Sequence, residues 1–174
     1  MVLRAAALRC RLFNLSGLAA HSSAPRFANE HVDLADLLAS HGVAKRVALA
    51  EICEPLGIPV KTVASGADVA ALWAAGDRER IGAYVLEDAV VALILYFVLA
   101  GFQAADETLV VRPLAALARH IEERPALDSL QPLCDCVLLR WARPRALQAD
   151  VVAALNHVSA RLRRMEDEQL FASS

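Results

Sequence analysis

The sequence predicts a predominantly helical protein with a sizeable core. Of its 174 residues, 57% are hydrophobic and only 5% are aromatic, and the apolar residues are mostly Ala, Leu and Val. This mixture fills helices well and argues against disorder over most of the length. So few aromatic rings leave little for stacking on nucleic acid bases. The net charge of −2 excludes a globally basic protein, so a polyanion would have to meet a local patch or a bound metal.

Apolar residues at helical spacing, bounded by glycine, proline or capping residues, locate the helices. Asp77 is placed to cap the longest of them, and Gly42, Gly57 and Gly76 are placed to end three others. A loop rich in Ser, Gly and Pro separates the first helix from the second. The predicted helices span residues 2–12, 31–42 after an extended start, 49–56, 68–75, 77–99, 109–121, 134–141 and 146–171.

The last predicted helix is amphipathic. One stripe carries Val151, Leu155, Val158 and Leu162. Three arginines lie outside that stripe, at positions 161, 163 and 164, and acidic residues follow them at 166–168. Opposite charges this close predict a solvated helix face.

The four cysteines are predicted to be reduced, structural thiols. They are Cys10, Cys53, Cys134 and Cys136, in a chain of ordinary domain size without a recognisable signal peptide. The Cys134-Asp135-Cys136 segment could ligate a metal. The nearest spare histidines, His120 and His157, lack standard zinc spacing, so the structural role is favoured.

The longest apolar run predicts a buried core helix. It covers residues 89–102 and stops short of the roughly 18–20 residues that a membrane span requires, so we expect no membrane contact. The first 29 residues hold four arginines and no acidic residue, a pattern that fits an organellar transit peptide and a helix at a domain edge equally well. Of the two possible locations, an organelle and the cytoplasm, we expect the cytoplasm.

Three motifs follow one another in a distinctive order. Residues 31–38 read His-x-Asp-Leu-x-Asp-Leu-Leu, residues 56–61 read Leu-Gly-Ile-Pro-Val-Lys, and Tyr84 and Asp88 form a Tyr-x-x-x-Asp motif before the apolar helix. This order resembles the predicted 3′-to-5′ exonucleases related to the proofreading domain of family B DNA polymerases. The resemblance covers the rear half of such a domain, without its front half.

The resemblance implies an α/β fold of the ribonuclease H-like type. This chain would carry mostly the helical C-terminal part of that fold over residues 1–105, followed by a helical C-terminal extension over residues 106–174. The family usually has Cys-Glu after the tyrosine and Val-Leu-Asn-Thr after the aspartate. Here Val85-Leu86 and the apolar residues 89–92 stand in those places, so polar positions near the motif have become apolar.

The resemblance also implies a chemistry for the Tyr-x-x-x-Asp motif. A spacing of four places Tyr84 and Asp88 on one face of a helix, about one turn apart. In the family's mechanism two Mg²⁺ or Mn²⁺ ions hydrolyse phosphodiesters at the 3′ end of single-stranded nucleic acid. Asp88 would hold one metal and Tyr84 would orient the attacking water, while Lys61 would contact a phosphate or serve as a solvated surface lysine.

Two hard dications need more carboxylates than Asp88 provides. The family supplies three others from motifs that precede the part matched here. The acidic pair in Asp77-Arg78-Glu79 has a similar spacing but stands at a helix start, where capping is the expected role. Because those three carboxylates are not found in the matched part, we expect a nuclease that is truncated or degenerate.

Other acids near the motifs are predicted to be structural. Asp33 and Asp36 are expected to cap a helix or to pair with His31 and Lys61. Glu87 is expected to point a quarter turn away from Asp88 into solvent.

A second hypothesis from a different class is a noncatalytic helical protein-interaction module. In it Tyr84 and Asp88 are ordinary helix residues, and the amphipathic C-terminal helix binds a partner. A three-layer fold without its leading strands would also leave apolar surface uncovered, so self-association is possible in either case.

Overall fold

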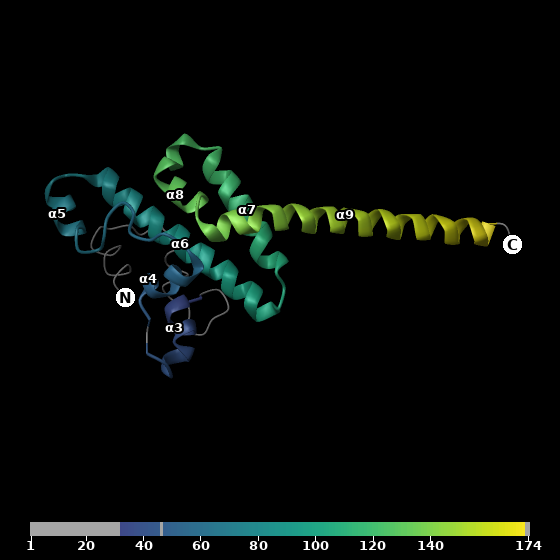
Figure 1. The fold of residues 1–174 in the computed structure, drawn as a ribbon, viewed down its shortest axis with the longest axis horizontal. Helices are drawn as coiled ribbons and strands as arrows, with labels where there is room; N and C mark the ends of the chain where they lie inside the picture. The colour runs from purple at the N-terminus through teal and green to yellow at the C-terminus, as the bar shows by residue number, and fades with distance from the viewer. Residues whose placement is uncertain (1–31, 46, 173–174) are drawn as a thin grey trace, which may run out of the picture. The chain divides into compact units, whose positions relative to one another are not determined.

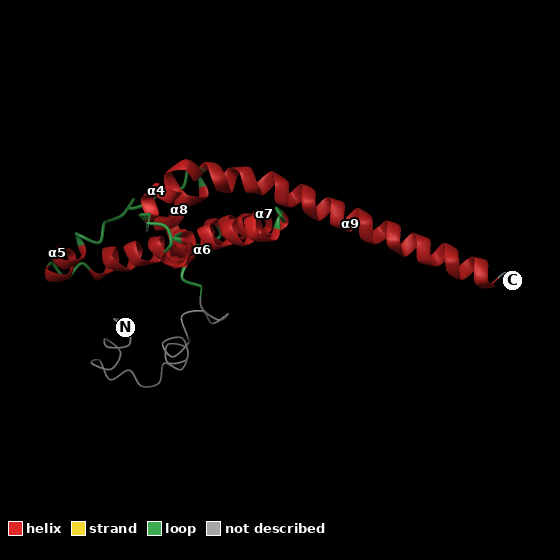
Figure 2. Cartoon of the chain, turned by 90° about the horizontal axis from the view of Figure 1, so that it is seen from below, coloured by secondary structure: helices red, strands yellow, loops and turns green. Residues whose placement is uncertain are grey.

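The computed structural model describes residues 32–45 and 47–172 (Figure 1). All regular secondary structure in these ranges is helical, as the composition predicts (Figure 2). The helical part of the predicted fold is therefore confirmed. Strands do not occur in the described ranges, so the ribonuclease H-like sheet stays a prediction, and the predicted helix over residues 2–12 lies outside them. Contacts divide the chain into two compact units, Met1–Val47 and Ala48–Ser174.

In the first unit, the described part holds one short helix and one tight turn. Helix α3 spans Leu34–Leu38, and the carboxylate of Asp33 caps it by accepting from the Asp36 N–H at 3.0 Å. A 3₁₀ turn, η1, follows over Ser40–Gly42. The helix predicted to run to Gly42 ends earlier, at Leu38, and the chain continues into η1, where His41 and Gly42 adopt positive φ (57° and 91°).

The second unit opens with two short helical pieces. Helix α4 spans Leu49–Cys53 and continues into the 3₁₀ turn η2 over Glu54–Leu56. Gly57 ends this segment in the left-handed conformation, with φ of 64°, which glycine adopts without a steric penalty. Helix α5 then spans Val69–Ala74. These bounds follow the prediction closely.

Helix α6, Arg78–Ala104, is the longest apolar segment. Asp77 caps it as predicted, accepting from the Arg80 N–H at 3.1 Å. It runs five residues past the predicted end at residue 99. Val110 of the next helix occupies the space where a Cβ of residue 101 would lie, so only glycine fits at that position. Only one side of α6 is covered, and Phe102 is 82% exposed. The prediction of a buried core helix is therefore only partly right.

By length and composition alone, α6 could cross a membrane. It has 27 residues and a mean hydropathy of 2.2 over an 18-residue window, of which 33% is buried inside the structure. The core helix of a soluble protein meets the same criteria, so the support for a span is weak. The length argument made from residues 89–102 was wrong, because the helix extends beyond that run at both ends. The absence of membrane contact stays a prediction.

The core is built where α7 packs between α6 and α9. Helix α7 spans Thr108–Glu122, the 3₁₀ segment η3 Pro125–Leu130, helix α8 Gln131–Cys134 and helix α9 Val137–Ala172. Aliphatic side chains from α6 to α9 are fully buried there: Ile94, Leu114, Leu130, Leu133 and Leu139.

Helix α9 runs without a break through Pro144, where the sequence predicted a boundary between two helices. A proline inside a helix removes one hydrogen bond and costs about 3 kcal/mol. Leu139, Ala142 and Ala146 are buried on both sides of it, in the part of α9 that packs on α7. This packing offsets the cost and keeps the helix continuous.

The core arrangement predicts a position-dependent loss of stability within α7. Leu114 is fully buried, whereas Leu109 is 44% exposed. Leu114→Ala should lower the free energy of unfolding by about 2–5 kcal/mol, because it leaves a cavity. Leu109→Ala is the matched control and should cost about 1 kcal/mol or less. Urea denaturation followed by circular dichroism measures both, and equal losses would contradict this core.

Candidate functional site

Tyr84 and Asp88 lie one turn apart on α6, as their spacing predicts. Their side chains form a hydrogen bond, which, with partial burial and the nearby carboxylates, raises the pKa of Tyr84 above its ordinary value. Both residues are half-buried. A Cβ added at Gly66 would lie 3.4 Å from the Tyr84 hydroxyl, so the loop before α5 passes close to the phenol. The pair is thus partly shielded at a helix surface.

Glu87 is buried, contrary to the prediction that it points into solvent. It is only 1% exposed. Its Oε1 atom accepts from the Thr62 N–H at 2.9 Å and from the Thr62 hydroxyl at 2.8 Å, and its Oε2 atom accepts from the Val63 N–H at 3.3 Å. A buried carboxylate requires such donors. Glu87 therefore fastens the loop before α5 to α6.

The same loop is held from a second point on α6. The Arg80 Nε–H donates to the Val63 carbonyl at 3.1 Å, and Ala64 is buried. Lys61, at the start of this loop, has a left-handed φ of 60° and an exposed side chain. Glu87 and Arg80 thus hold the backbone next to Lys61 against the helix that carries Tyr84 and Asp88.

The described residues do not assemble a two-metal centre around Asp88. They contain no group of three or more His, Cys, Asp or Glu side chains that could hold a metal ion. Two dications need several oxygen ligands each, so Asp88 does not fit the metal pair by itself. The metal requirement implied by the family resemblance is therefore not met within the described part of the chain.

The acids of the first motif have local structural partners. Asp33 caps α3, and Asp36 is buried, with its carboxylate 2.8 Å from the Nδ1 atom of His41. The predicted capping role of Asp33 is confirmed. His41 is thus one partner of Asp36, and the pairings expected with His31, which lies outside the described residues, and with Lys61 stay predictions.

Three cysteines are described, and all are free and buried. The Cys134 thiol donates to the Ala118 carbonyl at 3.6 Å. Burial raises the pKa of Cys53 to about 11, which keeps its thiol protonated and unreactive near neutral pH. These contacts support the predicted structural role, while Cys10 lies outside the described residues.

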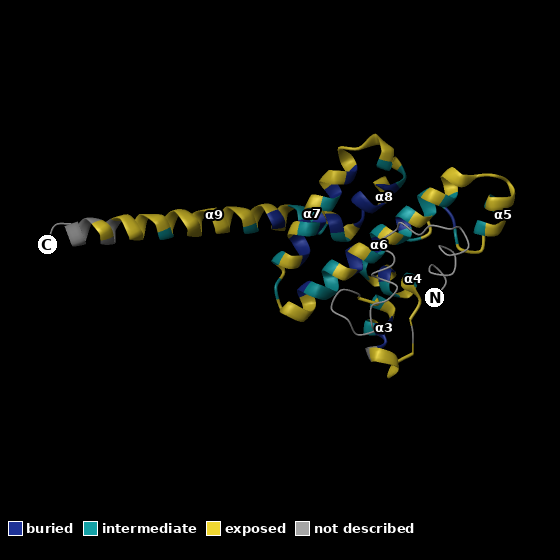
Figure 3. Ribbon diagram, turned by 180° about the vertical axis from the view of Figure 1, so that it is seen from behind, coloured by how far each residue is buried: buried dark blue, intermediate teal, exposed yellow. Residues whose placement is uncertain are grey.

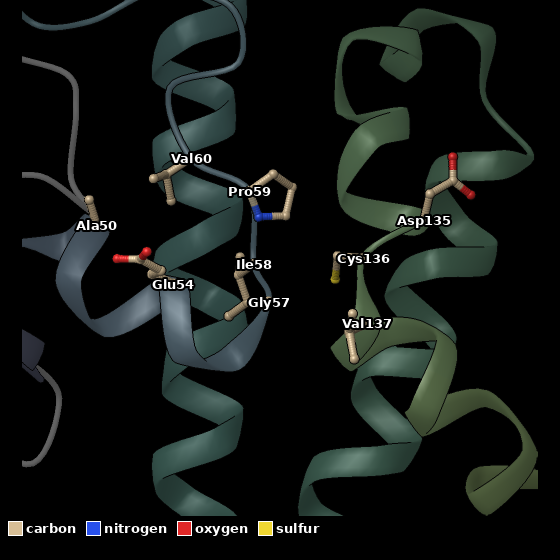
Figure 4. A pocket seen from close by; sticks show the side chains of 9 residues that line it. All are labelled: Ala50, Glu54, Gly57, Ile58, Pro59, Val60, Asp135, Cys136 and Val137. Atoms are coloured by element: carbon tan, nitrogen blue, oxygen red, sulfur yellow. The ribbon is translucent and has the colours of Figure 1, made fainter.

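Two pockets lined by described residues of the second unit do not include Tyr84, Asp88 or Lys61. One, of about 580 Å³, lies between the α4–η2 segment and the start of α9; Figure 4 shows the carboxylates of Glu54 and Asp135 pointing in opposite directions on its two sides. The other, of about 510 Å³, lies between α7 and α9. There Arg112 and Arg145 already pair with acids, Asp150 and Glu107. The Tyr84–Asp88 pair therefore lies outside both of these pockets.

Fold and site together define a class of protein: a helical domain that presents a hydrogen-bonded phenol and carboxylate on one side of a long apolar helix. Residues 19–124 match a family described as predicted 3′-5′ exonucleases related to the exonuclease domain of PolB. The match covers more than half of the 174 residues, so this protein belongs to that family. The matched residues include Lys61, Tyr84 and Asp88.

The match extends into the region that the sequence assigned to a C-terminal extension. It ends at residue 124, beyond the predicted boundary at 105, and that boundary stays a prediction. Comparison with curated proteins and with solved structures gives no match. The sequence analysis did not identify Glu87 as a buried residue; its signal is an acid inside the Tyr-x-x-x-Asp motif, just before the apolar residues that begin at 89.

The Glu87 contacts predict that one substitution releases the loop. Glu87→Ala should lower the free energy of unfolding by about 2–4 kcal/mol, since it leaves the Thr62 and Val63 N–H groups without an acceptor. Amide hydrogen exchange at Thr62 and Val63 should speed up more than exchange in α7. Glu79→Ala, on the exposed first turn of α6, is the control and should leave both measurements nearly unchanged. Slow exchange at the two loop amides in Glu87→Ala would contradict the contacts.

The Tyr84–Asp88 hydrogen bond predicts a measurable titration. The sequence has two tyrosines, so a Tyr96→Phe background isolates Tyr84 in an ultraviolet titration. Its pKa should lie above the ordinary value of 10.0 and fall when Asp88→Asn is added. Because the folded-state pKa is raised, the stabilisation from Tyr84 is complete below pH 10 and declines as the pH rises through the folded-state pKa. An unchanged Tyr84 pKa in Asp88→Asn would exclude the bond.

Proposed function

We propose that this protein acts on the 3′ ends of single-stranded nucleic acid as a 3′-5′ exonuclease. The observation that carries the proposal is the Tyr84–Asp88 pair, hydrogen-bonded on α6 and located inside the family match. A carboxylate suits the hard cations, Mg²⁺ or Mn²⁺, that phosphodiester hydrolysis uses. A phenol beside it suits the positioning of a water molecule.

The proposed site is incomplete or degenerate. Asp88 is one oxygen ligand, whereas the described residues hold no group of three acids, histidines or cysteines around it. Leu86, Val91 and Ala92 stand where the family usually has Glu, Asn and Thr. We therefore propose that hydrolysis needs further carboxylates and that it is slow in this chain alone.

The loop held by Glu87 supports a role for Lys61 in this proposal. Glu87 accepts from the Thr62 N–H at 2.9 Å, so the backbone beside Lys61 is fixed on the helix of Tyr84 and Asp88. The exposed Lys61 ammonium is then available to a phosphate of the bound strand. A cytoplasmic location is part of the proposal, since free, buried cysteines suit a reducing compartment.

Nucleotide release from a 3′-labelled single strand tests the proposed activity. The unmodified protein should release label slowly in Mn²⁺ and not in excess chelator. Asp88→Asn and Tyr84→Phe should each reduce release by about 100-fold. The control is Glu79→Gln, in the exposed first turn of α6 and five residues before Tyr84, and it should match the unmodified protein.

Two outcomes of this assay would overturn the proposal. Release that is equal in the Asp88→Asn and Glu79→Gln variants would point to a contaminating nuclease. A complete lack of Mn²⁺-dependent release by the unmodified protein would exclude catalysis by the chain. It would leave the second candidate, a noncatalytic helical interaction module, which the exposed apolar side chains of α9 favour.

A further inference from the structure

The second half of α9 carries apolar side chains that nothing in the described structure covers. From residue 151 to 165 every residue is exposed except Ala160, which is half-buried (Figure 3). Six of them are large and apolar, with exposed fractions from 48% to 61%, and all but Val152 recur at intervals of three or four residues. We name these five the α9 stripe: Val151, Leu155, Val158, Leu162 and Met165.

The spacing of the α9 stripe is that of a coiled coil. Its members follow one another at intervals of four, three, four and three residues. This repeat places Leu155 and Leu162 at heptad position a, and Val151, Val158 and Met165 at position d. A 3.5-residue repeat keeps the apolar seam facing a second helix over its whole length. The stripe therefore fits another helix with the same repeat.

Charge decides between the two orientations of a second copy. Arg161 occupies position g, and in the sequence a glutamate follows it by five residues, at 166, which is position e of the next heptad. Parallel helices pair g of one copy with e of the other across these five residues. An antiparallel alignment that overlaps the whole stripe is centred on its midpoint, residue 158, and places Arg161 beside Ala154 and Leu155 of the other copy, where no acidic residue faces it. The parallel arrangement is favoured.

We propose that copies of this protein associate in parallel through the α9 stripe. Leucine at position a with a β-branched residue at position d, as at Val151 and Val158, is similar to the Leu-Ile pattern that favours more than two strands. Arg163 and Arg164 occupy positions b and c, outside the seam. The occupant of the stripe is thus a second copy of the same helix, and further copies can join on the same pattern. This association is independent of the nuclease activity proposed above.

Light scattering of the full chain over a range of concentrations tests the association. The mass should exceed the 18.7 kDa of one chain and fall on dilution. Leu155→Asp combined with Leu162→Asp should give 18.7 kDa at every concentration, with an unchanged circular dichroism spectrum at low concentration, because both side chains are exposed in the single chain. The control is Asn156→Asp, which adds the same side chain beside the stripe and should leave the association unchanged. A mass of one chain for the unmodified protein throughout would overturn the proposal.

A charge exchange tests the parallel register separately. Arg161→Glu should weaken association by about tenfold, since it replaces attraction by repulsion at each g–e contact. Adding Glu166→Arg should restore it, because the opposite charges face each other again with their signs exchanged. A double variant that stays as weak as Arg161→Glu would exclude the parallel register.

Discussion

The buried carboxylate of Glu87 constrains how the middle of this chain can be arranged. A carboxylate that leaves water needs hydrogen-bond donors, or it costs several kcal/mol. Here the donors are the N–H group and the hydroxyl of Thr62, 25 residues earlier in the chain, and the N–H group of Val63, 24 residues earlier. The loop between η2 and α5 therefore has to follow α6. That course brings Gly66 close to the Tyr84 hydroxyl.

The same helix supports the core from its other end. Gly101 lets Val110 approach the α6 backbone, and α7 can then turn back along α6 and pack on α9. The continuous α9 depends on this packing, since burial around Pro144 offsets the lost hydrogen bond. The first half of α6 thus contacts the loop between η2 and α5, and its C-terminal end contacts α7.

The two proposals concern separate surfaces. Tyr84 and Asp88 belong to the first half of α6, which carries the family motif, whereas the α9 stripe begins at residue 151, beyond the family match that ends at 124. A carboxylate–phenol pair at the surface and an uncovered heptad seam have different physical requirements. The first needs additional oxygen ligands, and the second needs another helix.

The sequence by itself determined the features that depend on interactions within about four residues. These include the caps at Asp33 and Asp77, the left-handed end at Gly57 and the one-turn spacing of Tyr84 and Asp88. The order of motifs along the chain also indicated the family without any tertiary contact. Only the tertiary structure decided the burial of Glu87 and the continuity of α9 through Pro144. The donors of Glu87 lie a full loop and helix away, and the packing that stabilises α9 comes from α7, so no local pattern could indicate either.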